Sequence, residues 1–346
     1  MTYSNESIID KISLHVIGNK STEDILKLSK QSISINEEIN GILSLYFLNS
    51  FRSKEYFVFS HESDLSLNEV FVYVSKIFEN QEELHEQSIN LAKHLYEQST
   101  HPKIKSGEFY TVYFKDCIVD GTTTDAVGLF KSENKDTFLK IFAHGDGFGI
   151  ESEKGVNINK LDKGCLIFNI EKENGYVVSV VDNTNKGVEA LYWKDDFLHI
   201  KPRKDEYYNT QNVLSLCKSF VKEGLPEKFE VSKADQVNFL NKSVEYFKKN
   251  QDFDMTTFAD EVIGQKEVIE SFNQYKSDYE FARELAVLDR FSISEAAVKK
   301  QAKSLKSVIK LDKNFHIYVH GDREMIEQGT DEEGRKYYKI FYSQES

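Results

Sequence analysis

Cysteine and proline are scarce in this sequence, and the scarcity of cysteine excludes two classes of small protein. The 346 residues include three cysteines and three prolines. Cys117, Cys165 and Cys217 lie about fifty residues apart, with no C-x-x-C pair and no histidine at metal-ligand spacing nearby. This spacing excludes a disulfide scaffold and a zinc ribbon. We therefore expect three reduced thiols in the core.

Long apolar runs are also absent. The longest nearly uncharged apolar stretch, residues 41–51, is much shorter than the roughly 20 residues that a membrane-spanning helix needs. The first six residues contain no basic region followed by an apolar one, so they carry no export signal. From these two absences we expect no membrane span and a cytoplasmic location.

Positive charge is in deficit. The chain has 44 lysines and arginines against 57 aspartates and glutamates, a net charge of -13. Such a chain repels the phosphate backbone of nucleic acid at long range. Any contact with nucleic acid must therefore be local, or must run through a partner. Otherwise the chain, at 40% hydrophobic and 29% charged residues, has the composition of a globular protein, and its length favours two domains.

In the first two-thirds of the chain, the spacing of apolar residues changes from one typical of helices to the two-residue period of strands. Residues 1–105 contain short strand candidates at 12–17 and 56–59, a helix predicted to start at the Ser66–Glu69 capping-box pattern, and a helix over 83–98. From Gly107 to Ile200 strands alternate with turns such as Asp120-Gly121. The expected strands are 109–114, 125–130, 137–142, 166–171, 176–182, and 190–193 continuing to 200. Because the connections are too short for parallel crossovers, we expect an antiparallel meander covered by helices on one face.

The last third returns to a helical period. Helices are predicted over 210–223, 233–249, 256–263, 268–283 and 294–310, with strands over 315–320 and 337–342. The sequence thus predicts an α+β fold: a central antiparallel sheet between helical N- and C-terminal regions, with a small C-terminal β segment. We place the domains at residues 1–205 and 206–346.

The predicted helix over 294–310 carries the largest concentration of basic residues in the chain. Its apolar positions recur at helical spacing, and a lysine follows each one, which predicts a lysine stripe beside the buried face. The candidate DNA-binding residues are Lys299, Lys300, Lys303, Lys306, Lys310 and Lys313.

Two interpretations of this lysine stripe stay open. In the first, it is a solvated face whose alkyl stems cover the core. In the second, it contacts phosphates. Lysine, as a point charge, favours backbone contact without reading of the base sequence.

Other combinations of residues give weaker signals. The His-Gly-Asp triplets at 144–146 and 320–322 fit ordinary turns, and two pairs do not make a metal site. No Walker A, Rossmann, G-x-S-x-G or H-E-x-x-H motif is present. A metal-dependent nuclease would need carboxylates and a lysine around a metal ion. Such a set occurs within twenty residues: Asp116, Asp120, Asp125, Glu133 and Lys135.

The order of several segments resembles the bacterial nucleoid-associated protein family of the NdpA/YejK type. The stretches 107–117 and 125–133 are similar to the central sheet of that family, and the strand candidate at 12–17 also fits. Towards the C-terminus, residues 258–262, the helix over 294–310 and the run 307–312 leading into 315–317 resemble the family's pattern. The resemblance covers nearly the whole chain.

The resemblance implies a cytoplasmic protein that fractionates with the nucleoid, has no established enzymatic activity and has type II topoisomerases as partners. It provides no residue-level DNA-contact motif. We therefore expect a non-enzymatic nucleoid-associated protein, without cofactor or metal, that binds DNA weakly or is recruited by a DNA-processing protein. The alternatives are an acidic interaction scaffold for a type II topoisomerase and the metal-dependent nuclease.

Overall fold

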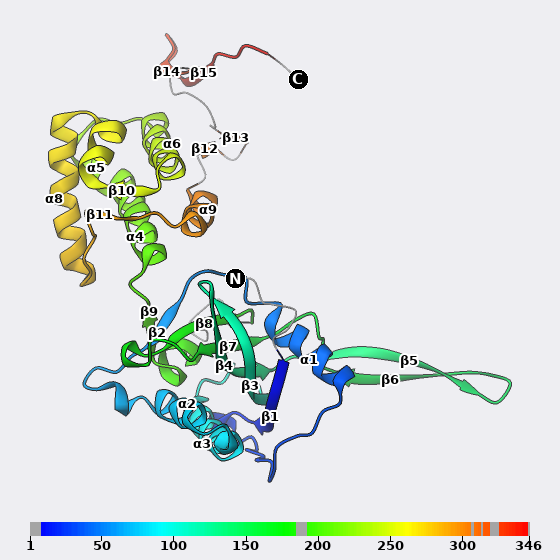
Figure 1. The fold of residues 1–346 in the computed structure, drawn as a ribbon. Coiled ribbons are helices and arrows are strands. Elements are labelled where there is room, and N and C mark those ends of the chain that lie inside the picture. Colours follow the sequence, from blue (N-terminus) through cyan, green and yellow to red (C-terminus); the bar gives the residue numbers. More distant parts are fainter. Residues whose placement is uncertain (1–7, 185–191, 306–307, 313, 319–324, 345–346) are drawn as a thin grey trace. The chain divides into compact units, whose positions relative to one another are not determined.

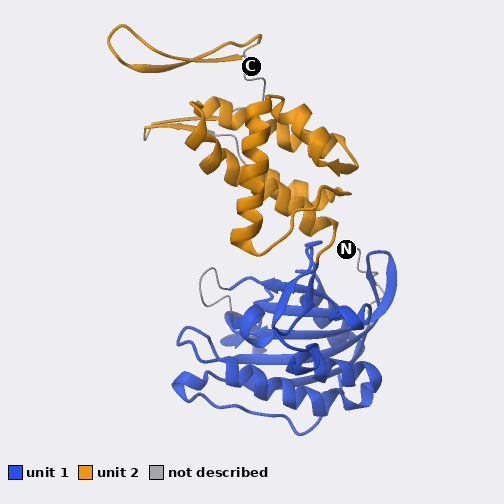
Figure 2. Ribbon diagram, turned by 90° about the vertical axis from the view of Figure 1, so that its left-hand side faces the viewer, with its two compact units in different colours: residues 1–203 blue, residues 204–346 orange. Residues whose placement is uncertain are grey.

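The structure is a computed structural model, and it describes residues 8–184, 192–305, 308–312, 314–318 and 325–344. The chain divides into two compact units, residues 1–203 and 204–346, which Figure 2 colours separately. The first unit contains the large sheet, and the second is mainly helical (Figure 1). The α+β fold class predicted from the sequence is confirmed.

A seven-stranded antiparallel sheet forms the centre of the first unit. Its strand order is β1-β3-β4-β7-β8-β2-β9. The strands are β1 (Ile8–Ile17), β2 (Phe57–Phe59), β3 (Gly107–Val119), β4 (Thr122–Ser132), β7 (Lys163–Phe168), β8 (Val177–Asp182) and β9 (Ile200–Pro202). At the β3–β4 turn, Asp120 and Gly121 have φ of 47° and 80°, the paired positive values of a type I′ two-residue hairpin turn.

Helices cover both faces of this sheet, whereas the sequence predicted cover on one face. On one face, α2 (Glu69–Glu79) and α3 (Leu84–Gln98) pack against residues such as Phe109 and Val127. On the other face, α1 (Glu37–Leu48) places Phe47 on Phe130, with stacked rings 4.1 Å apart. The strands are consequently buried on both sides, and their two-residue period marks the face on which each residue lies, not a boundary between core and solvent.

Three further sequence predictions for the first unit differ from the structure. The predicted strand at 137–142 lies in β5 (Asp136–His144), which pairs with β6 (Gly147–Gly155) in a separate hairpin and not in the central sheet. The predicted strand 190–193 is not a strand where it is described: Tyr192–Phe197 forms a π-helical turn, and residues 190–191 lie outside the described residues. The first helix predicted after Ser66 starts instead at Glu69, because Asn68 caps it.

The second unit packs its helices around one apolar cluster that contains Phe220, Phe247, Phe258 and Phe272. Its helices are α4 (Glu206–Ser219), α5 (Leu225–Lys228), α6 (Lys233–Lys249), α7 (Met255–Phe258), α8 (Lys266–Arg283) and α9 (Glu295–Ser304). The described part of this unit also contains three two-stranded antiparallel pairs. β10 (Asp252–Asp254) pairs with β11 (Arg290–Ser292), β12 (Val308–Leu311) with β13 (Phe315–Tyr318), and β14 (Ile326–Thr330) with β15 (Lys336–Ile340). No helix in the described part of the chain is long and apolar enough to cross a membrane.

Candidate functional site

The lysine-rich helix predicted over 294–310 is shorter in the structure. Helix α9 begins after Ser294, whose hydroxyl accepts the backbone N–H of Ala297, and it ends at Ser304. Strand β12 follows, and its Ile309 is buried against α6. The helical period failed here because Val308 and Ile309 are β-branched residues that fit a strand as well as a helix.

Because α9 is shorter than predicted, the six candidate lysines do not all lie on one helix. Lys299, Lys300 and Lys303 lie on α9 and are exposed. Lys310 is exposed on β12, so it does not continue a helical stripe. Lys306 and Lys313 lie outside the described residues. Lys300 lies 5.7 Å from the centre of the Tyr207 ring on α4, a cation–π contact.

Lys299 and Lys303 line a groove in the second unit together with Lys248 and Lys249 from the end of α6. We call this feature the basic groove. It has a volume of about 850 Å³, and its lining also includes the apolar residues Phe247, Ile293, Val298 and Ala302. The groove thus combines an apolar floor with four ammonium groups from two helices.

The charges around the basic groove are incompletely neutralised by near neighbours. Glu295 is the one acidic residue in its lining, and its carboxylate lies 3.6 Å from the ammonium of Lys299. Lys248 pairs with Glu245 at 2.7 Å on its own helix. Both pairs are largely exposed, with side-chain exposures of 53% to 88%, so solvent screens them strongly. The groove is therefore an electropositive site on an acidic protein.

Sequence reasoning missed Lys248 and Lys249. Their signal was visible as two adjacent lysines at the end of the helix predicted over 233–249, a prediction that matches α6. Lysines in a last helical turn are usually assigned to the helix dipole, which they neutralise. Only the packing of α6 beside α9 shows that the two lysine pairs share one groove.

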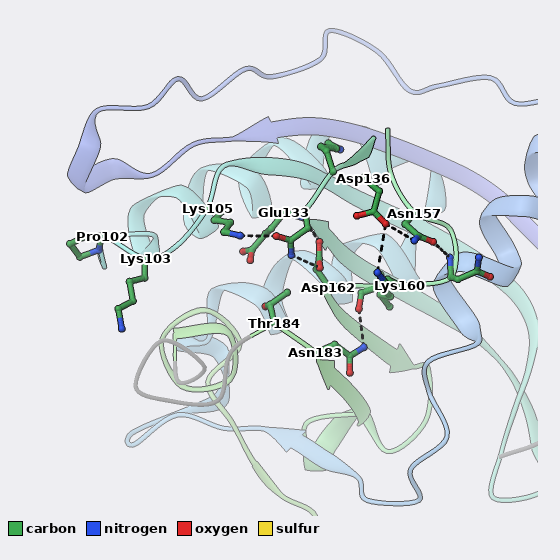
Figure 3. A pocket seen from close by; sticks show the side chains of 14 residues that line it. Pro102, Lys103, Lys105, Glu133, Asp136, Asn157, Lys160, Asp162, Asn183 and Thr184 are labelled. Carbon is green, nitrogen blue, oxygen red and sulfur yellow. Dashed lines mark hydrogen bonds and ion pairs between the residues drawn. The ribbon is translucent and has the colours of Figure 1, made fainter. Parts of the chain in front are cut away.

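A second, larger hollow lies in the first unit, where the β4–β5 connection meets the segment before β7 (Figure 3). Its volume is about 1020 Å³, and its polar lining includes Lys103, Lys105, Lys135 and Lys160. Asp162 organises its wall by accepting the backbone N–H groups of Glu133 and Asn134 at 2.6 and 2.8 Å.

The lysines of this hollow have protein partners. Lys105 donates to the side chain of Asn134 at 2.7 Å, Lys135 pairs with Glu108, and Lys160 lies 3.6 Å from Asp136. Figure 3 shows the dashed contacts of Lys105, Asp136 and Asp162 within the lining. Three carboxylates share this lining, so the hollow has mixed charge, whereas the lining of the basic groove has four lysines and one carboxylate.

Behind this hollow, two buried lysines form ion pairs. Lys131 lies 3.0 Å from Glu133, and Lys163 lies 2.9 Å from Asp182. Tyr192 donates its hydroxyl to Glu133 at 3.0 Å. Burial lowers the pKa of Lys131 although Glu133 opposes the shift, and burial raises the pKa of Tyr192. These contacts tie β4, β7 and β8 to the π-helical turn, so the simplest role for this cluster is structural.

The carboxylates of the nuclease hypothesis do not converge. Asp125 lies in the first half of β4 and Glu133 follows its last residue, so the two are about 26 Å apart at a rise of about 3.3 Å per residue. Asp125 accepts the Tyr113 hydroxyl, and Asp120 pairs with Arg203. Over the described ranges of the chain, no group of three histidines, cysteines or acidic residues is arranged to hold a metal ion.

The remaining sequence signals have simple structural positions. The triplet at 144–146 forms the tip of the β5–β6 hairpin, as the turn interpretation predicts, and the triplet at 320–322 lies outside the described residues. All three cysteines are buried and none of them forms a disulfide, as predicted. Burial raises the pKa of Cys217 to about 12 and also raises that of Cys165, so neither thiol is activated.

Comparison with known proteins identifies a family. Residues 13–334 of the 346 match the sequence model of the family described as "Nucleoid-associated protein YejK". No curated protein sequence matches the chain. The family match spans both units.

Proposed function

Because the chain belongs to the family of the nucleoid-associated protein YejK, we propose that it is a non-enzymatic, cytoplasmic protein of the nucleoid that contacts DNA phosphates through the basic groove. The observation that supports this proposal is the convergence of Lys248, Lys249, Lys299 and Lys303 on one groove, in a chain whose net charge is -13. The contact is local because the rest of the molecule repels DNA.

The residue types in the groove favour binding without sequence preference. All four basic residues are lysines, and an ammonium contacts a phosphate as a point charge, without the bidentate geometry that reads a guanine. Non-specific complexes of this kind have dissociation constants of about 10⁻⁴ to 10⁻⁶ M at physiological salt. We expect the affinity of this protein to lie in that range.

The test is fluorescence anisotropy of a labelled DNA duplex titrated with the full-length protein. Four phosphate contacts give a slope of log K against log salt of about -3.5, so affinity should fall about 100-fold between about 50 and 200 mM salt. Two duplexes of unrelated sequence should bind with the same affinity. Binding that does not change with salt contradicts a phosphate contact.

A charge-matched pair of variants locates the contact. Replacing the four groove lysines by glutamate should abolish binding. The control replaces four exposed lysines of the same unit that do not line the groove, namely Lys218, Lys222, Lys228 and Lys266. Each set of substitutions lowers the net charge equally, so general repulsion is the same in both variants. Equal losses of affinity in the two variants would assign the effect to net charge and not to the groove.

Recruitment by another protein is the alternative outcome. If the wild-type protein does not bind DNA at low salt, direct contact is wrong and a DNA-processing protein must bring the chain to the nucleoid. A type II topoisomerase is the partner that the family resemblance implies. In that case a pull-down with the topoisomerase should persist after nuclease treatment and collapse at high salt, since an acidic surface would then bind a basic domain.

A further inference from the structure

The β5–β6 hairpin, residues 136–155, leaves the central sheet as a separate two-stranded ribbon (Figure 1). We call this hairpin the arm. Nine cross-strand residue pairs connect its strands, from Asp136 with Gly155 at the base to His144 with Gly147 at the tip. Within the described residues, β5 and β6 pair only with each other. Both faces of the arm therefore depend on their own side chains, or on a partner, for cover.

One face of the arm covers itself. Side chains of directly paired residues point to the same face, so Phe138, Lys140 and Phe142 share a face with their partners Glu153, Glu151 and Gly149. The Phe142 ring lies over Gly149, and the Phe138 ring lies over Gly155. Lys140 pairs with Glu153 at 3.3 Å. This face is partly apolar but carries charge at its centre, which is typical of a solvated surface.

The opposite face is apolar and open. Its central pair is Ile141 with Ile150, and both side chains are 67% exposed. Leu139 and Phe148 flank this pair and are 71% and 82% exposed. The remaining partners in these three cross-strand pairs are Ser152 and Ala143, so no charge occurs among the pairs. We call these four large side chains the apolar face of the arm.

Exposure of this kind has a physical cost. An isolated two-stranded ribbon is at best marginally stable in water, and it becomes stable when a hydrophobic face packs against another surface. A contiguous patch of a few hundred Å² is about the largest that a monomer usually exposes, and such a patch marks an interaction site. The arm therefore requires an occupant for its apolar face.

We propose that the apolar face of the arm packs against the same face of a second copy of this chain, related by a two-fold axis near the Ile141–Ile150 pair. The absence of charge from these three pairs permits a second copy as the occupant. Two chains of net charge -13 repel each other, and the three uncharged pairs give them a surface where they can approach without opposing like charges. A two-fold axis makes the surface self-complementary because each isoleucine meets its own equivalent.

The size of the surface fits a weak dimer. Stacking two such faces buries roughly 1,000 Å² in total, which is the lower limit for a specific interface. We therefore expect a dimer with a dissociation constant in the range of about 10 to 100 µM. Because no charge occurs among the three central pairs, raising the salt concentration should leave the dimer intact or strengthen it by screening the net repulsion. This proposal does not depend on the proposed DNA contact, which salt should weaken.

Sedimentation velocity across about 1 to 200 µM protein tests the proposal. The wild type should shift from monomer to dimer as concentration rises. The double variant Ile141→Asp with Ile150→Asp should stay monomeric, with dimerisation at least about tenfold weaker. Lys140→Asp is the control, because it changes the net charge by the same two units but lies on the other face. A wild type that is monomeric throughout, or a double variant that still dimerises like the control, would overturn the proposal.

A cysteine variant tests the geometry without adding charge to the face. Ile141→Cys introduces one exposed thiol into a chain whose own three cysteines are all buried. Mild oxidation should then give a disulfide-linked dimer, whereas Lys140→Cys should give much less. Equal crosslinking of the two variants would mean random collision and would contradict the two-fold packing. Capture of a different protein by the arm, with no dimer at any concentration, would assign the apolar face to that protein.

Discussion

At the scale of single residues, the hydrogen bonds of His15 fix its charge state. The backbone N–H of Ser29 donates to Nδ1 at 3.0 Å. The Ser88 hydroxyl donates to the carbonyl oxygen of His85, so it accepts the Nε2–H of His15 at 2.8 Å. Both ring nitrogens are thus satisfied in the neutral form. Burial, together with the nearby His85, lowers the pKa of His15 to about 4.

This low pKa predicts a loss of stability in mild acid. Between pH 6.5 and 4 the unfolded chain takes up a proton at His15 and the folded chain does not, so the free energy of unfolding falls as the pH falls through this window. The expected contribution is about 2 kcal/mol between pH 7 and 5. Urea denaturation at both pH values should show this loss in the wild type, and His15→Gln should lose about that much less. Equal losses in the two proteins would contradict the assignment.

The burial of two lysines could not be predicted from the sequence. A lysine in a strand pattern reads as exposed, yet Lys131 and Lys163 are fully buried. Each is neutralised by a carboxylate that folding brings to it, Glu133 in one case and Asp182 in the other. Burial of a charge depends on a partner with the right geometry, and no local pattern along the chain shows that partner.

At the scale of elements, helix caps were partly visible in the sequence. The capping-box pattern at Ser66 does not start a helix, since Asn68 caps α2 instead. A complete capping box occurs at α6, where Ser232 and Asp235 accept each other's backbone N–H groups at 3.1 and 3.0 Å. At α9, Ser294 accepts one backbone N–H at the longer distance of 3.4 Å. These two serines form a natural comparison.

We expect Ser232→Ala to destabilise the second unit more than Ser294→Ala does. Loss of a good cap costs about 1 kcal/mol, and the reciprocal bond from Asp235 is disturbed as well. The weaker cap at Ser294 should cost about half as much or less. Urea unfolding followed by circular dichroism at the helical band gives both values. A larger loss for Ser294→Ala would show that the capping geometry does not control the stability of these helices.

At the scale of the whole molecule, each unit has its own apolar core. The clusters around Phe109 and Phe130 contain residues of the first unit, and the cluster around Phe220 contains residues of the second. The chain has a single tryptophan, Trp193, which is fully buried in the first unit. Its fluorescence therefore reports on that unit alone, while most of the helical signal comes from the second unit.

Two cores predict two unfolding transitions. Urea curves recorded by Trp193 fluorescence and by circular dichroism should have different midpoints, because the two units need not unfold together. His15→Gln should shift mainly the Trp193 fluorescence curve. Ser232→Ala should shift mainly the circular dichroism curve. Coincident curves for the wild type and both variants would show that the two units unfold as one cooperative body.

The sequence by itself determined the features that depend on neighbouring residues. It predicted the α+β class, the helix 233–249, the turn at Asp120-Gly121, the buried thiols and the family. The structural features among these follow from periodicity, turn chemistry and composition, which act over a few residues, whereas the family came from the resemblance of whole segments. The lysine pair at 299 and 303 was also visible.

The tertiary structure decided everything that depends on distant segments. It placed α1 on the second face of the sheet, turned residues 136–155 into a free arm, and brought Lys248 and Lys249 beside Lys299 and Lys303. Each of these outcomes depends on which distant segment an element packs against. The same local sequence pattern is compatible with many such segments. The free energy of burying apolar surface selects among them only when the whole chain is folded.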